Sequence, residues 1–558
     1  MSKKYTGIDP VIILPGINHS RVFVCDESGN VMTDSSGKEI SGTILMANGE
    51  AARERMPALL RNLTKAAVSR KSDGVYESAY ELAAGAFPYQ HSGPDGIPYS
   101  NLRVDRHSQP LSELDEAEKD WIYKMVPMQD LTAVCGEDKI YFFAFNLIGD
   151  PMESARELDE YIRRVKAERG CKKVTILPIS LGGTILTAYI QQFGHGDVGR
   201  IVNAVACLDG TDIVADIFDK KFNPSREFFR HRFIPSLLAE ETGNPAPGYA
   251  ANILLRSLPD KALGEAVDGL LDGMRENILF TCPQFWAMIP ARRYESLRDK
   301  YIAGAEFDKL REKTDAFHQA AVNLRENLKK AKKDGVKISM ISGSNLGFGE
   351  VEYGFFEAVE SYDKYNTDGV INLSSTTLGA RGITKGGRPF DPSKPFVSPD
   401  GMIDASAALF PESTFIFMNQ HHEIGKNSAA LNLIKDIILG KVEDINSDPA
   451  NYPEFNFSCN TYELRRWRIN DAEKLLGRID AGEIPASASD RERLIKAIEK
   501  GRYILSSSVI KHEDARAAKN EIEDLLIMFG SMKKKEEKKP AGKFAEKLLE
   551  NISRKLSR

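Results

Sequence analysis

Residues 174–183 read Val-Thr-Ile-Leu-Pro-Ile-Ser-Leu-Gly-Gly, and this stretch decides the fold class. The apolar, partly β-branched run at its start predicts a buried strand, and the segment 184–192 directly after it has the composition of a helix. Ser180 therefore stands at a sharp turn from a strand into a helix. That is the setting of a nucleophile elbow, in which a serine hydroxyl is exposed at the top of a sheet. The stretch indicates acyl transfer through a covalent acyl-serine.

Further buried strands are predicted on both sides of this stretch. Asp150 is a candidate N-cap for a helix between two of them, and an apolar stripe follows it at helical spacing. Strands that alternate with helices predict a mostly parallel sheet with helices on both faces, an α/β fold. The predicted strands are Val11–Leu14, Ile140–Phe145, Val174–Pro178, Ile201–Leu208, Val336–Ile341 and Thr414–Met418.

Changes in pattern along the chain predict five units. A first part of the α/β core is expected at 1–215, with lid-like excursions at about 20–110, of which 74–110 is predicted to be a long irregular loop because it is rich in Gly, Pro, Ser and Tyr. The other units are a helical cap insertion at 216–334, a second part of the core at 335–443, a helical C-terminal extension at 444–530 and a basic amphipathic tail at 531–558.

Composition restricts the class of protein. Apolar residues make up 42% of the chain, enough for a large core, and the net charge of −5 argues against a nucleic-acid binder. The six cysteines are scattered without a CxxC pair, which argues against a zinc or thioredoxin-type site, and Cys207 is predicted to be a buried thiol. No signal-peptide core and no spanning segment is recognised, so a cytoplasmic location is expected unless a signal has been removed.

A serine nucleophile needs a general base, and that base is expected in the loop after the last strand. Thr414–Met418 is followed by His421 and His422. We prefer His421 because the apolar Ile424 stands three residues after it and can anchor the loop. His422 is the competing choice.

The acid that orients this base is expected after the strand Val336–Ile341. Asp368 stands in a tight glycine turn before an apolar pair and is the preferred residue. Asp400 repeats that pattern, and Asp404 follows shortly after it, so both stay open as alternatives.

An oxyanion needs two backbone N–H donors. One is expected from Leu181, directly after the serine. The other is expected from the loop that begins at Pro15 and Gly16, where either Ile17 or Asn18 would donate. This chemistry requires no cofactor and no metal ion.

With these residues in place, the chain resembles the lipase-like α/β-hydrolases, and among them the lecithin:cholesterol acyltransferase-like group. The resemblance covers about residues 8–440 and implies an α/β-hydrolase fold. Two residues beside the serine depart from the pattern of that group, Pro178 in place of Gly and Ile179 in place of His. The segments that carry the resemblance are Pro10–Gly16, Tyr141–Asn146 with Asp150–Ala155, Asp209–Thr211, Phe285–Pro290, and Asp368–Val370 with Ser374–Thr376.

The resemblance and the residues together predict a serine hydrolase that cleaves carboxylic esters. The apolar cap residues Phe285, Trp286, Met288 and Ile289 favour a lipid-like substrate in a covered cleft. An acyltransferase and a non-catalytic binding protein with this fold are the alternatives. The basic tail either docks on an anionic membrane as a peripheral contact or is solvated.

Overall fold

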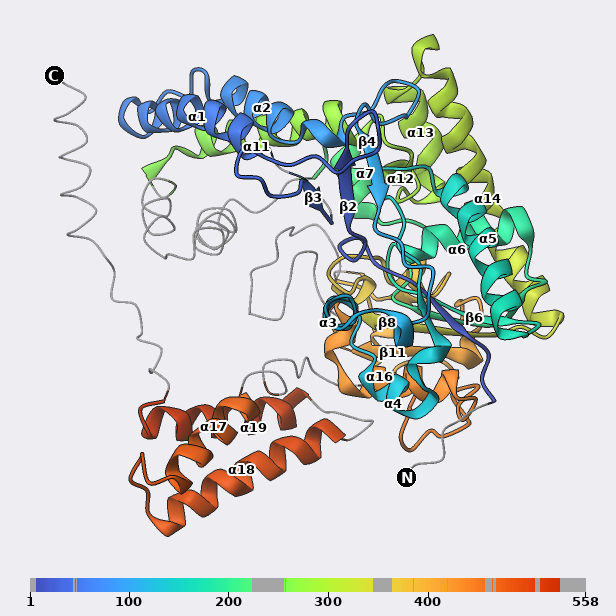
Figure 1. The fold of residues 1–558 in the computed structure, drawn as a ribbon, viewed down its shortest axis with the longest axis vertical. Coiled ribbons are helices and arrows are strands. Elements are labelled where there is room, and N and C mark those ends of the chain that lie inside the picture. The colour runs from blue at the N-terminus through green and yellow to red at the C-terminus, as the bar shows by residue number, and fades with distance from the viewer. Residues whose placement is uncertain are drawn as a thin grey trace.

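The computed structural model describes most of the chain, and its centre is a seven-stranded sheet (Figure 1). Every pair of neighbouring strands in the sheet is parallel, in the order β12-β11-β8-β7-β6-β1-β5. The structure describes residues 7–43, 46, 48–222, 255, 257–344, 364–384, 386–418, 420–456, 464, 468–506 and 512–531. The seven strands are β1 (Val11–Leu14), β5 (Ile140–Phe142), β6 (Val174–Pro178), β7 (Val198–Ala204), β8 (Lys337–Ser344), β11 (Thr414–Met418) and β12 (Phe455–Asn456).

Helices cover both faces of this sheet, which confirms the predicted α/β-hydrolase fold class. Side chains of β1 alternate between two large apolar clusters. In β1, Ile12 and Leu14 belong to the cluster with α5, α6 and α14, whereas Val11 and Ile13 belong to the cluster with α3, α4 and α16. Two-sided burial explains why these strands read as continuous apolar runs in the sequence. The helices of the two faces are α5 (Pro151–Arg169), α6 (Gly182–Phe193) and α14 (Asp308–Lys333), and α3 (Glu116–Met125), α4 (Gln129–Cys135) and α16 (Ser428–Ile438).

Asp150 caps α5 as the sequence predicts. Its carboxylate accepts the Met152 amide at 2.8 Å, and Pro151 occupies the first helical position, where a missing N–H costs nothing.

A small three-helix unit stands apart from the sheet and corrects one prediction. Its helices are α1 (Gly49–Ser69), α2 (Val75–Ala86) and α11 (Asp260–Met274), and they share their own small apolar core. Residues 75–86 are therefore helical, and the irregular loop expected over 74–110 is wrong in this part. The Gly, Pro, Ser and Tyr content of the whole window concealed a short run of helix-forming Ala, Leu and Glu residues.

The remaining elements surround this framework. The aromatic segment expected to line a covered cleft, Phe285 to Ile289, is instead core: Trp286 is 2% exposed and its ring packs edge-on against Phe218 at 4.9 Å. The helices outside the sheet layers and the three-helix unit are α7 (Asp212–Phe218), α12 (Pro283–Trp286), α13 (Ala291–Tyr301), α15 (Leu373–Thr376), α17 (Ile469–Asp480), α18 (Ala488–Ser506) and α19 (His512–Met528). The strands outside the central sheet are β2 (Val22–Cys25), β3 (Ser41–Gly42), β4 (Asn101–Val104), β9 (Arg381–Gly382) and β10 (Ile403–Asp404).

The C-terminal helices α17, α18 and α19 pack on one another, and their apolar residues join the cluster that contains α16. Of the predicted basic tail, residues 532–558 lie outside the described residues. No helix in the described part of the chain has the length and apolar character needed to cross a membrane.

Candidate active site

Ser180 lies in the turn between β6 and α6, in a backbone conformation that a residue with a side chain rarely adopts. Its φ is +52°, in the left-handed region. Two hydrogen bonds hold it there: the Ser180 amide donates to the Ala204 carbonyl at 3.2 Å, and the Cys207 amide donates to the Ser180 carbonyl at 2.7 Å. The turn is therefore tied to the end of β7 and to the chain directly after it, and these bonds keep the strained residue in place.

The two glycines after the serine allow this close approach. A Cβ at Gly183 would lie 2.7 Å from the Cys207 amide nitrogen, and a Cβ at Gly182 would overlap the Leu14 carbonyl. Neither neighbour can move, since both are backbone. Cys207 itself is 3% exposed, as predicted, and burial raises the pKa of its thiol to about 12.

His422 links Ser180 to Asp368 through two hydrogen bonds. Its Nε2 lies 2.7 Å from Ser180 Oγ, and its Nδ1 lies 2.7 Å from Asp368 Oδ2. The Asp368 side chain is fully buried. Its other oxygen, Oδ1, accepts the amides of Val370 at 3.0 Å and Ile371 at 2.8 Å. The carboxylate is thus fixed by the glycine turn that the sequence indicated, with one oxygen left for the imidazole.

The preference for His421 over His422 does not agree with this geometry. His421 is 4% exposed and its Nδ1 accepts the Glu423 amide at 3.2 Å, whereas the ring that bonds to Ser180 Oγ is that of His422. Neighbouring residues in a non-helical segment point to different sides, so one of the two rings can face the serine. The His422 amide donates to the Asp368 carbonyl at 2.9 Å, which turns its ring toward Ser180.

The two alternative acids are engaged elsewhere. Asp404 lies in β10 and pairs with Arg381 at 2.9 Å. Asp400 accepts the Ser398 hydroxyl at 2.6 Å within its own turn. Of the three candidates, Asp368 is the one that contacts the histidine.

The loop after β1 runs directly past the serine. A Cβ at Gly16 would lie 3.3 Å from Ser180 Cβ, and the His19 amide closes a turn onto the Gly16 carbonyl at 3.2 Å. Ile17 and Asn18 occupy the centre of that turn. Leu181 stands at the N-terminus of α6, where amides have no intrahelical acceptor. Donation to an oxyanion by these amides stays a prediction.

His19 is a residue of this site that the sequence analysis missed. Its Nδ1 accepts the Gly16 amide at 3.3 Å, so a neutral ring carries its proton on Nε2. Burial is the main cause that lowers the pKa of His19 to about 4. Repulsion from His422 lowers this pKa further, and attraction from Glu423 partly opposes both. Its position in the same loop as Ile17 and Asn18 is the signal that could have identified it.

The low pKa of His19 predicts a pH dependence of stability. In the unfolded chain a histidine has a pKa near 6.5. Between pH 6.5 and 4 the unfolded state therefore binds this proton and the folded state does not. The free energy of unfolding falls as the pH is lowered through this range. We expect His19→Gln to reduce the loss of unfolding free energy between pH 7 and pH 5 by about 1–2 kcal/mol. Urea unfolding at the two pH values measures this difference. Equal losses in the wild type and the variant would contradict it.

The turn that carries Asp368 is held against the start of α7. The Asp212 amide donates to Asn372 Oδ1 at 2.8 Å, and Asn372 Nδ2 donates to Asp212 Oδ2 at 3.1 Å. The Thr211 hydroxyl donates to the Val370 carbonyl at 2.8 Å. The acid turn is therefore positioned by α7 as well as by its own glycine.

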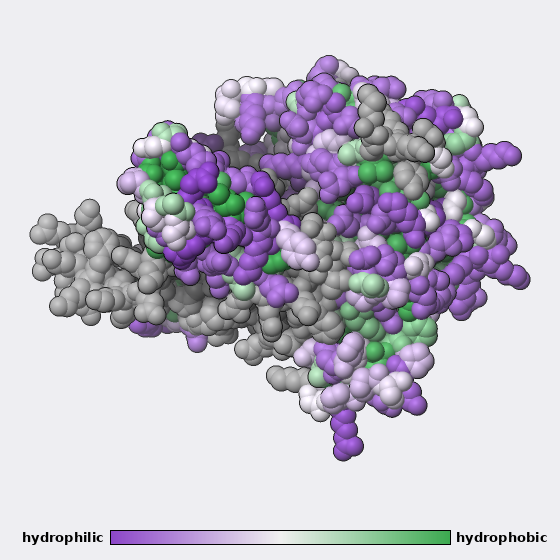
Figure 2. Space-filling model, turned by 90° about the horizontal axis from the view of Figure 1, so that it is seen from below, coloured by the Kyte–Doolittle hydropathy of each residue, from purple (hydrophilic) through white to green (hydrophobic). Residues whose placement is uncertain are grey.

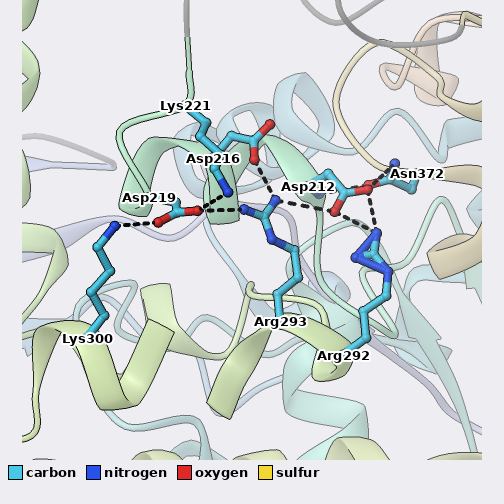
Figure 3. Close-up of polar contacts among 8 residues, drawn as sticks. All are labelled: Asp212, Asp216, Asp219, Lys221, Arg292, Arg293, Lys300 and Asn372. Carbon is cyan, nitrogen blue, oxygen red and sulfur yellow. Dashed lines mark hydrogen bonds and ion pairs between the residues drawn. The ribbon is translucent and has the colours of Figure 1, made fainter. Parts of the chain in front are cut away.

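A network of ion pairs extends this support to α13 (Figure 3). Arg293 points between the acidic residues of α7 and pairs with Asp216 at 2.5 Å, while Arg292 pairs with Asp212 at 2.6 Å. Asp219, next to α7, pairs with Lys300 at 2.8 Å. The two helices are thus joined on the side where Asn372 meets Asp212.

Two properties of the described residues bear on other chemistries. Within the part of the chain that the structure describes, no group of three or more His, Cys, Asp or Glu side chains could hold a metal ion. The polar groups around Ser180 are a hydroxyl, imidazoles, a buried carboxylate and backbone amides. These groups can generate a nucleophile and move a proton.

Comparisons with known proteins give similar solved structures and no sequence relative. No family model and no curated protein sequence matches the chain. Phospholipase PlaB from Legionella pneumophila is similar over 61% of this chain and 58% of its own, at 12% identity and a TM-score of 0.26. This chain thus spans less than two thirds of that protein's length. The Tle4–Tli4 complex contains a chain similar over 79% of this chain and 100% of its own, at 11% identity and a TM-score of 0.29. Neither structure is described as a lecithin:cholesterol acyltransferase, and at these scores neither likeness indicates a function.

Proposed function

We propose that this protein is a serine hydrolase that cleaves carboxylic esters. The observation that carries the proposal is the continuous hydrogen-bonded chain from Ser180 Oγ through His422 to the buried Asp368, with 2.7 Å at each link. A serine hydroxyl becomes a useful nucleophile when a base accepts its proton and an acid orients that base. The left-handed conformation of Ser180 between a strand and a helix supports its role as a nucleophile elbow.

In the proposed reaction, Ser180 Oγ attacks the ester carbonyl carbon while His422 Nε2 takes the hydroxyl proton. The carbonyl oxygen becomes an oxyanion, for which we assign the amides of Leu181 and of Ile17 or Asn18 as donors. The imidazolium then gives its proton to the leaving alcohol, and an acyl-serine remains. Water activated by His422 releases the acid. Asp368 keeps the other imidazole proton on Nδ1 throughout.

Covalent labelling tests this proposal. A fluorophosphonate probe phosphonylates a serine that has an adjacent base, so the expected result is one modified peptide that contains Ser180. Ser180→Ala is expected to remove the label. The matched control Ser36→Ala changes an exposed serine of the 34–38 turn and is expected to retain it.

A label on another residue, or an intact protein that stays unlabelled, would overturn the proposal. Product analysis with and without an acceptor alcohol then separates the two acyl acceptors. Free acid as the main product in both cases supports hydrolysis, whereas a new ester that replaces the acid would show acyl transfer to the alcohol.

A further inference from the structure

Helix α1 carries apolar side chains over an arc that is wider than the part its partner helices cover. Leu59, Leu63 and Ala66 face α2 and α11 and form part of the small core of the three-helix unit. Beside this buried side, Met56 is 37% exposed and Leu60 is 47% exposed. A surface helix ordinarily has one apolar stripe, which faces the protein. In the described part of the chain, the contacts of the three-helix unit leave this edge of the apolar arc exposed.

The outward residues form a line along the helix. Met56, Leu60 and Val68 stand at intervals of four and eight residues, so at about 100° per residue they lie within an arc of about 120° around the helix, and Val68 is 53% exposed. Thr64 fills the remaining position, and its hydroxyl donates to the Leu60 carbonyl at 2.7 Å. The one polar group of this line is thus bonded within the helix. We call Met56, Leu60, Thr64 and Val68 the α1 apolar stripe.

Basic side chains flank the α1 apolar stripe. Arg61 and Lys65 each follow a stripe residue by one position and are exposed. Among the side chains of α1 that the structure describes, and those of the two residues after it, the exposed charged ones are Arg53, Glu54, Arg61, Lys65, Arg70 and Lys71. Five of these six are basic, although the whole chain has a net charge of −5. An apolar stripe bordered by Lys and Arg is typical of helices that lie in the surface of an anionic membrane.

The placement of α1 suits this role. The three-helix unit lies at the edge of the molecule, away from the central sheet (Figure 1). Figure 2 shows the molecule from below, from the end where α17–α19 lie in Figure 1, and the described surface there is mainly hydrophilic, with hydrophobic residues in small separate groups.

We propose that the α1 apolar stripe and its basic flank dock this protein on an anionic lipid bilayer. The occupant is a lipid surface because the exposed apolar residues are bordered by cationic side chains, which matches acyl chains beneath a layer of anionic headgroups. One part of this proposal rests on the proposed ester hydrolysis: docking on a bilayer makes membrane lipid esters the substrate class of the site at Ser180.

Vesicle flotation of the intact protein tests the docking. We expect binding to vesicles of phosphatidylcholine with phosphatidylglycerol and at least about tenfold weaker binding to phosphatidylcholine alone. Met56→Ser/Leu60→Ser/Val68→Ser and, separately, Arg61→Glu/Lys65→Glu are each expected to weaken binding to the anionic vesicles about tenfold or more. The matched control Val322→Ser/Lys330→Glu changes two exposed residues of α14 and is expected to bind as the wild type does.

Two further measurements separate docking from catalysis and from folding. Ser180→Ala is expected to bind vesicles normally, so the docking can hold even if the proposed reaction is wrong. The α1 variants are expected to keep the wild-type circular dichroism and hydrolysis of a soluble p-nitrophenyl ester, and to lose hydrolysis of vesicle lipids.

Three results would overturn the docking proposal. Unchanged vesicle binding by both α1 variants would assign any binding to another segment, such as the basic run at 533–539. Equal binding to neutral and anionic vesicles would remove the role of the basic flank. A dimer that the apolar-stripe variant breaks, in a protein that does not bind vesicles, would make a second copy the occupant.

Discussion

Replacement of His422 by Ala is expected to lower kcat for a soluble ester by about 10⁴–10⁶-fold, because Ser180 loses the group that accepts its proton. His421→Ala is expected to retain most of kcat, since this ring accepts the Glu423 amide and the Ser180 hydroxyl bonds to His422. The two substitutions remove the same side chain at adjacent positions, so each is the matched control of the other. Steady-state kinetics of both variants measures the difference.

The His421 variant also tests the sequence-based choice of base. A severe loss of kcat in His421→Ala with an active His422→Ala would restore His421 as the base and contradict the geometry. Comparable losses in both variants would point to a general disturbance of the loop. Circular dichroism and urea unfolding of both proteins identify that case.

Asp368→Asn is expected to lower kcat by about 10⁴-fold while the protein stays folded. The reason is the direction of the hydrogen bonds. Two amides, those of Val370 and Ile371, donate to Oδ1, so the oxygen of the new side chain must remain there. Its NH₂ group then faces His422 Nδ1, which must become the acceptor. The imidazole proton moves to Nε2, and the ring can no longer accept the Ser180 proton.

The alternative acids provide controls for this substitution. Asp400→Asn and Asp404→Asn are expected to change kcat by less than about tenfold, because their carboxylates bond to Ser398 and Arg381 and not to the histidine. A loss in either variant that matches that of Asp368→Asn would contradict the assignment of the acid.

Several features of the site could be predicted because they are written in local sequence. Ser180 follows a β-branched run and precedes two glycines, and these residues favour a sharp strand-to-helix turn whatever surrounds them. Asp368 precedes Gly369, whose φ of +91° needs a glycine, and the resulting turn brings two amides to the carboxylate. Both signals extend over fewer than ten residues.

Other features depend on parts of the chain that are distant in sequence. His421 and His422 share one local environment in the sequence, and the choice between them rests on a backbone hydrogen bond from His422 to Asp368, 54 residues earlier. His19 acquires its low pKa from burial beside His422, a contact across most of the chain. The aromatic segment at Trp286 could not be distinguished from the lining of a cleft, because apolar residues look the same in both places.

The sequence by itself determined the approximate positions of six strands of the sheet, the α/β fold class and the candidate nucleophile, because β-branched runs, helix caps and glycine turns act through neighbouring residues. Only the tertiary structure decided which histidine faces Ser180, that Phe285–Ile289 is core, and that part of the apolar arc of α1 stays exposed. These outcomes depend on which surfaces meet once the sheet and its helices have assembled. A side chain's partners are then set by packing between distant segments, which local sequence does not encode.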